Sequence, residues 1–108
     1  MLSTRIKTKI ELKEFIGLIK KYNKEQIECT SHTFFRLSEA QRKIYTSKEL
    51  TRILFEKIPF LAGIQFNDNY AVFYRYNSKV LKVIISLNIK KIDIVTFYFI
   101  EEWQIPKI

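Results

Sequence analysis

The fold is indicated most clearly by residues 70–87, which have the sequence YAVFYRYNSKVLKVIISL. Two runs rich in β-branched and aromatic residues flank Asn77 and Ser78, a pair that is typical of a tight turn. Because so short a connection can join only antiparallel neighbours, the stretch predicts two adjacent antiparallel strands.

The same kind of sequence continues on both sides of this pair. The cluster Asn67, Asp68 and Asn69 separates it from an earlier apolar run, and residues 88–91 separate it from a later one. We therefore expect a four-stranded antiparallel sheet with short connections. Its strands are predicted at residues 60–66, 70–76, 80–87 and 92–100.

The residues before Pro59 favour helices instead. Residues 8–11 and 46–49 both have the form of a capping box, in which a hydroxyl and a glutamate satisfy free N–H groups at a helix start. Apolar residues at helical spacing follow each box, which predicts one helix over about 10–23 and a second that Pro59 stops. A short strand at residues 26–31 and short helical turns at 32–36 and 38–41 are also expected.

Length and composition bound the architecture. The chain has 108 residues, of which 47% are hydrophobic and 15% aromatic, as expected for one folded domain spanning residues 1–108. Helices at about residues 8–58 precede strands at about residues 60–100. The predicted class is α+β, with N-terminal helices packed on one face of the four-stranded antiparallel sheet.

Strand periodicity places several polar residues on one face of the sheet. These residues are Lys82, Ser86, Thr96 and Tyr98. The same period predicts that Val95 shares the opposite face with Phe97 and Phe99. The polar face could hold a substrate, although a solvated face is the commoner case for an antiparallel sheet.

The charge balance points to an anionic partner. Nineteen Lys and Arg residues against eleven Asp and Glu give a net charge of +8, which most simply indicates nucleic acid. No apolar run approaches the ~20 residues that span a bilayer, and the first residues lack the apolar stretch of a signal peptide. With one cysteine, Cys29, and one histidine, no zinc-site spacing exists. We expect a cytoplasmic protein with no metal, no cofactor and no membrane partner.

The candidate catalytic group is His32, the single histidine, which precedes Arg36 by one helical turn. Histidine exchanges a proton near neutral pH, and arginine binds phosphate in a two-pronged geometry. Such a pair suits a small RNA-cleaving protein. The alternative is a histidine that faces water at a helix start, beside a surface arginine.

The order of these residues resembles the RelE/BrnT-like end of the barnase–EndoU–colicin–RelE superfamily, over residues 28–100. The residues that carry the resemblance are His32, Arg36, Arg42, Ile44, Ser47, Leu50 and the sequence IVTFY of residues 94–98. Those families include small ribonucleases that act as toxins in toxin–antitoxin pairs and in bacterial competition, on a fold in which an antiparallel sheet cradles RNA. Arg42 departs from the pattern, because it lies further from His32 than the second arginine usually does.

The resemblance implies metal-independent RNA cleavage, in which the 2′-hydroxyl attacks the adjacent phosphate. The implied catalytic residues are His32 as proton carrier, Arg36 and Arg42 as phosphate clamps, and Thr96 and Tyr98 as positioning groups. The expected substrate-binding residues are Lys82, Ser86 and Tyr74, the last as a base-stacking ring.

The implied partners are mRNA or tRNA and a cognate antitoxin or immunity protein. The protein would act in the cytoplasm, or after delivery into the cytoplasm of a target cell. The alternative function is a non-catalytic module on the same fold, either an RNA-binding protein or a phage- or plasmid-encoded inhibitor.

Overall fold

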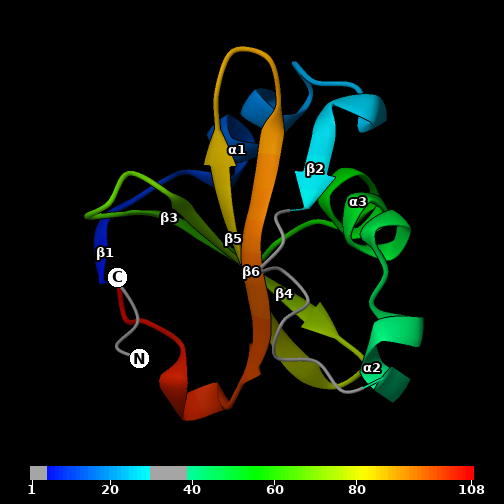
Figure 1. Ribbon diagram of the computed structural model, residues 1–108. Coiled ribbons are helices and arrows are strands. Elements are labelled where there is room, and N and C mark those ends of the chain that lie inside the picture. The colour runs from blue at the N-terminus through cyan, green and yellow to red at the C-terminus, as the bar shows by residue number, and fades with distance from the viewer. Residues whose placement is uncertain (1–4, 30–38) are drawn as a thin grey trace.

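Six strands form one sheet in the order β1-β3-β4-β5-β6-β2 within residues 5–29 and 39–108, which the computed structural model describes (Figure 1). The strands are β1 (Ile6–Lys9), β2 (Ile27–Cys29), β3 (Leu61–Gln65), β4 (Tyr70–Tyr76), β5 (Lys79–Leu87) and β6 (Ile92–Ile100). In the same ranges the helices are α1 (Leu12–Ile19), α2 (Glu39–Ile44) and α3 (Ser47–Glu56), with 3₁₀ turns η1 (Lys24–Gln26) and η2 (Glu102–Gln104). The α+β class is therefore confirmed.

Strands β3 to β6 are the four predicted strands, and each pairs antiparallel with the next. The connections of β3 with β4 and of β4 with β5 are tight because they contain residues with left-handed backbone angles. Asn77 and Ser78 have φ of 49° and 66°, and Asp68 has φ of 67°. Asparagine and aspartate tolerate this region better than most residues, and paired positive φ values suit a two-residue hairpin turn.

The prediction of a four-stranded sheet is wrong, because β1 and β2 extend it at both edges. Strand β1 pairs antiparallel with β3, and Thr8 lies opposite Ile64 instead of capping a helix. Helix α1 begins later than predicted, at Leu12, after Glu11, whose side chain makes no cap hydrogen bond. Strand β2, expected as a short strand, pairs parallel with β6.

The second predicted capping box is half right. The Thr46 hydroxyl accepts a hydrogen bond from the Glu49 N–H at 3.2 Å, and Leu50 and Ile53 are buried as the apolar stripe predicts. The Glu49 carboxylate instead pairs with Arg52. The helix ends at Glu56, before Pro59, and Ile58 beyond its end is 77% exposed.

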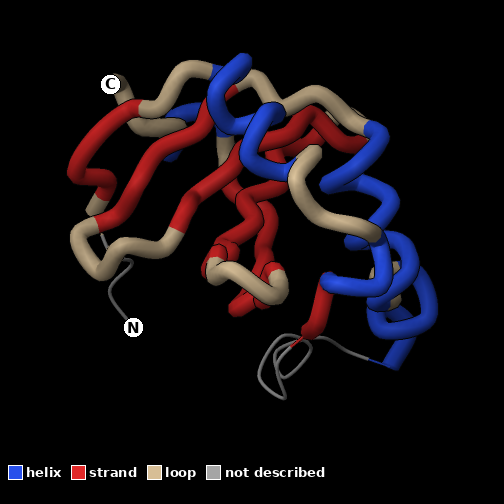
Figure 2. Tube along the Cα trace, turned by 90° about the horizontal axis from the view of Figure 1, so that it is seen from above, coloured by secondary structure: helices blue, strands red, loops and turns tan. Residues whose placement is uncertain are grey.

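Helices α1 and α3 cover one face of the sheet, here called the helix face (Figure 2). The main core lies there, where Phe15 and Ile53 pack with Leu81 and Ile94. The opposite face, here called the Lys82 face, carries a smaller apolar cluster. Its buried members are Leu61, Ala71, Phe73, Val80 and Ile84, with Ile105 of the C-terminal segment packed against them.

An irregularity in the pairing of β5 with β6 changes the face of the sheet on which Val95 lies. Ile84 pairs with Thr96, but the next residue, Ile85, pairs with Ile94, so Val95 is the extra residue of a bulge. Val95 packs against the cluster on the Lys82 face. The prediction that it shares a face with Phe97 is therefore wrong.

Within the described residues, none of the helices is long and apolar enough to cross a membrane.

Candidate nucleic-acid interface

A lysine between two aromatic rings forms the centre of the Lys82 face. Phe73, Lys82 and Tyr98 lie directly opposite one another on β4, β5 and β6. The Lys82 Nζ is 5.7 Å from the centroid of the Phe73 ring and 5.4 Å from that of Tyr98. Ring faces attract a cation at this distance, so both rings hold the ammonium in place.

The Lys82 ammonium has no carboxylate partner among the described residues, although the residue is only 8% exposed. Asp93, which lies on β6 two residues before the bulged Val95, pairs instead with Lys91 at 3.4 Å. The buried part of the residue is its apolar stem, which leaves the ammonium at the surface of the face without an anion among the described residues. An anionic ligand would complete this site.

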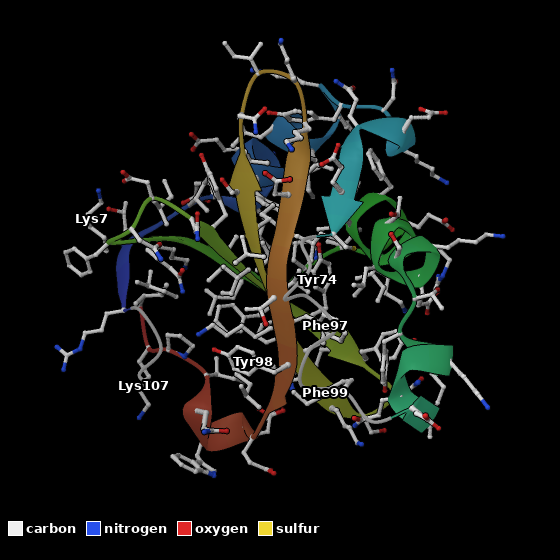
Figure 3. The ribbon with its side chains drawn as sticks, in the orientation of Figure 1. Lys7, Tyr74, Phe97, Tyr98, Phe99 and Lys107 are labelled. Atoms are coloured by element: carbon white, nitrogen blue, oxygen red, sulfur yellow. The ribbon has the colours of Figure 1, made fainter. Side chains whose placement is uncertain are left out.

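Hydroxyl groups lie beside the lysine on β6 and β5. Tyr98 pairs with Lys82, and Thr96 is the next β6 residue on the same face, opposite Ile84. Ser86 lies further along β5, opposite Asp93. The structure thus places Lys82, Ser86, Thr96 and Tyr98 on one face, as strand periodicity predicts; Figure 3 shows Tyr98 on the other side of β6 from Phe97 and Phe99.

The C-terminal segment bounds this face. The Arg75 guanidinium lies 4.5 Å from the Phe60 ring centroid and also pairs with Glu102 of η2. Phe60 in turn packs against Phe73, with ring centroids 6.3 Å apart. This chain of contacts holds η2 beside the face and leads into Ile105. Away from this segment, Ser86 of β5 and Thr96 and Tyr98 of β6 are the partly exposed polar residues of the face.

Tyr74, predicted to stack on an RNA base, cannot do so in this structure. It lies on the helix face, inside the main core, and is 1% exposed. Its hydroxyl is buried without a hydrogen-bond partner among the described residues, and this burial raises the pKa of Tyr74. The substrate-binding role predicted for Tyr74 is therefore wrong.

Replacing Tyr74 by phenylalanine is expected to raise the free energy of unfolding by about 1 kcal/mol, because the change removes a desolvated hydroxyl that gains no bond. Urea unfolding measures the effect. Tyr76→Phe is the matched control, since its hydroxyl donates a 2.6 Å hydrogen bond to Glu49 and its loss should lower stability. A destabilised Tyr74→Phe protein would mean that the hydroxyl has a partner.

The remaining predicted site residues are His32, Arg36 and Arg42. Helix α2, whose backbone includes Arg42, leads into Tyr45, and the Tyr45 ring packs against Tyr76 and Phe97 on the helix face. Helix α2 is thus on the side of the sheet opposite Lys82. The structure describes no side chain for Arg42, and His32 and Arg36 lie outside the described residues, so their roles stay predictions.

Sequence analysis missed a polar cluster on the helix face that joins α3 to β4. The Arg52 guanidinium donates to both Glu49 carboxylate oxygens, at 2.6 and 2.8 Å, and the Tyr76 hydroxyl donates to the same carboxylate. The hydrogen bonds from Arg52 and then Tyr76 lower the pKa of Glu49 to about 2. The same carboxylate raises the pKa of Tyr76 to about 12. The i,i+3 spacing of Glu49 and Arg52 was the available signal.

The Glu49 cluster predicts a definite dependence of stability on pH. Because the folded-state pKa of Glu49 is below its usual 4.5, its contribution is present above pH 4.5 and is lost as pH falls toward about 2. The contribution of Tyr76 is present below pH 10 and is lost as pH rises through about 12. Glu49→Gln should flatten both limbs in denaturation curves measured across pH, whereas Glu25→Gln, an exposed change, should flatten neither.

Comparisons of the chain with protein-family models, with curated proteins and with solved structures give no match. What the molecule does is therefore inferred from its charge and from the chemistry of its surfaces. Of the features above, the cation on the Lys82 face has the chemistry of a ligand site. The Glu49 cluster, by contrast, is satisfied within the chain.

Proposed function

We propose that the protein binds RNA on the Lys82 face and cleaves it as a small, basic, metal-independent ribonuclease toxin. The observation that carries this proposal is the Lys82 ammonium, which is held between two rings and lacks a carboxylate partner among the described residues. The net charge of +8 would draw a polyanion toward the surface before this site engages it.

Binding would combine one phosphate with one base. The phosphate would sit at the Lys82 ammonium, within reach of the hydroxyls of Thr96 and Tyr98, which can donate hydrogen bonds to its oxygens. The half-buried Tyr98 ring has a surface on which an unpaired base can stack. This combination favours single-stranded RNA over a duplex, whose bases are already stacked.

Cleavage needs a proton carrier in addition to these groups. In the proposed reaction the RNA 2′-hydroxyl loses its proton and attacks the adjacent phosphorus, while the leaving 5′-oxygen gains a proton. Lys82 would stabilise the negative charge that builds on the non-bridging oxygens. His32 would move the proton, a role that rests on its identity and its spacing from Arg36.

A RelE-like fold is part of the proposal. The helices gather on one face of an antiparallel meander and leave part of the other face for RNA, which is the layout that the resemblance implies. The edge strands β1 and β2 extend that layout. A ribonuclease acting in the cytoplasm would also need a cognate antitoxin or immunity protein to protect the cell that makes it.

RNA affinity is expected to fall steeply with salt, because each phosphate neutralised releases a counterion. For a single strand the slope of log affinity against log salt is about −0.7 per phosphate contacted. Fluorescence anisotropy of a labelled single-stranded oligonucleotide in rising KCl measures it, with cleavage followed on gels in the presence of EDTA. An affinity that does not change with salt concentration would contradict RNA binding. Binding without cleavage would support the non-catalytic alternative.

A further inference from the structure

An apolar groove lies between α1 and α3, on the helix face. It encloses a cavity of about 310 Å³. Its apolar lining consists of Phe15, Ile16, Ile19, Leu54, Phe55, Ile58 and Pro59. The groove is on the side of the sheet opposite Lys82, so anything bound there leaves the Lys82 face accessible.

The groove keeps apolar surface in contact with water. Ile58 is 77% exposed, and Ile16 and Phe55 are only half-buried. Helix α3 ends at Glu56, and Pro59 is buried, so Ile58 is held outward between two fixed points. Exposed apolar side chains that converge on one groove are typical of a binding surface.

The rim of the groove is positively charged. Lys20 and Lys57 line it, while the acidic rim residue, Glu56, is already paired with Lys24 at 3.7 Å. A second copy of this chain would bring another net charge of +8 to this surface, which opposes self-association. The charge is instead complementary to an acidic partner.

We propose that this groove binds an acidic amphipathic α-helix of a partner protein. Two helices flank the groove, and a third helix can pack its apolar residues between them as helices do in folded proteins. Its apolar face would cover Ile16, Phe55 and Ile58, and its carboxylates would reach Lys20 and Lys57. The proposal goes beyond the proposed function by giving a protein partner a site and a chemistry, and the groove does not depend on RNA binding.

The test uses a synthetic peptide of about 18 residues, long enough to form a helix, with leucines at i, i+3, i+4 and i+7 spacing and glutamates on the other face. Two further peptides are a scrambled sequence of the same composition and a version with lysine in place of each glutamate. Each is labelled and titrated with the full chain by fluorescence anisotropy. We expect only the acidic amphipathic peptide to bind.

Substitutions then locate the binding site. Ile58→Asn should weaken binding of the acidic peptide by about tenfold or more. Because the position is exposed, the variant should keep its fold, which circular dichroism checks. Ile44→Asn is the matched control, because Ile44 is 59% exposed but lies outside the groove. The affinity of this variant for the acidic peptide should be unchanged. Lys20→Glu should weaken binding of the acidic peptide and strengthen binding of the lysine-containing peptide.

Four results would overturn the inference. Equal binding of the scrambled peptide would show attraction by charge alone, and an unaffected Ile58→Asn variant would place the peptide elsewhere. A dimer that Ile58→Asn dissociates, seen by light scattering, would make a second copy the occupant. Competition by an RNA oligonucleotide would make RNA the occupant. Salt-dependent RNA binding that survives in Ile58→Asn would leave the proposed function standing even if the groove fails.

Discussion

Replacing Lys82 by methionine is expected to lower the rate of RNA cleavage by about 10²-fold or more and to weaken RNA binding, without loss of the fold. The ammonium would no longer stabilise charge on the phosphate, a loss that typically has this size. Methionine keeps an unbranched apolar side chain between the rings of Phe73 and Tyr98. Because methionine keeps the buried stem and the ammonium has no ion pair among the described residues, the free energy of unfolding should change little.

Lys79→Met is the matched control for this experiment. Lys79 lies on the same strand, and its Nζ is 5.3 Å from the centroid of the Phe99 ring, but it is exposed and does not belong to the Lys82 face. Both variants lose one unit of positive charge, so a general electrostatic effect would lower RNA affinity equally. Equal losses in the two variants would show that Lys82 is no specific phosphate site.

Replacing His32 by alanine is expected to abolish RNA cleavage while RNA binding remains. His32 is the single histidine of the chain, and no other side-chain type titrates near neutral pH without a shifted pKa. Wild-type cleavage should therefore depend on pH around 6 to 7 and persist in EDTA. Single-turnover cleavage and oligonucleotide anisotropy measure the two properties separately.

The variant's circular dichroism spectrum and thermal unfolding serve as its controls. If both match the wild type and cleavage is unchanged, His32 is not the proton carrier, and RNA binding on the Lys82 face would be unaffected by that conclusion. If binding and cleavage disappear together from a folded protein, His32 contacts RNA in the ground state as well.

The central meander could be predicted because its signals are local. Alternating apolar residues define β4 to β6, and Asn77 and Ser78 form the left-handed turn that their types favour. The shared face of Lys82 and Tyr98 follows from the same period of two. Neighbouring strands in register bring such residues together without any further information.

The errors occurred where distant partners decide the structure. Thr8 and the residues around it fit a capping box, but in the structure they form strand β1 and pair with β3. Local sequence does not encode this pairing. The bulge that turns Val95 to the Lys82 face is likewise a property of two strands together. The burial of Tyr74 depends on helices packing over β4, which the period alone does not show.

The candidate site was predicted only in part for the same reason. Strand periodicity predicted that Lys82 and Tyr98 share a face, but the positions of Tyr98 and Phe73 on either side of the ammonium depend on the register of β5 with its two neighbours. The cluster of Glu49, Arg52 and Tyr76 joins a helix to a strand, so only its helical half was visible in the sequence.

The parallel pairing of β2 with β6 has a consequence for how the chain folds. Ile27 of β2 pairs with Ile92 of β6, so this pairing closes a longer loop than any other strand pair of the described sheet. Closing so long a loop costs conformational entropy, and only three residue pairs of β2 with β6 repay it, so we expect this pairing to form after the meander is in place. Strand β2 is therefore expected to dock last, and weakening its contacts should mainly accelerate unfolding.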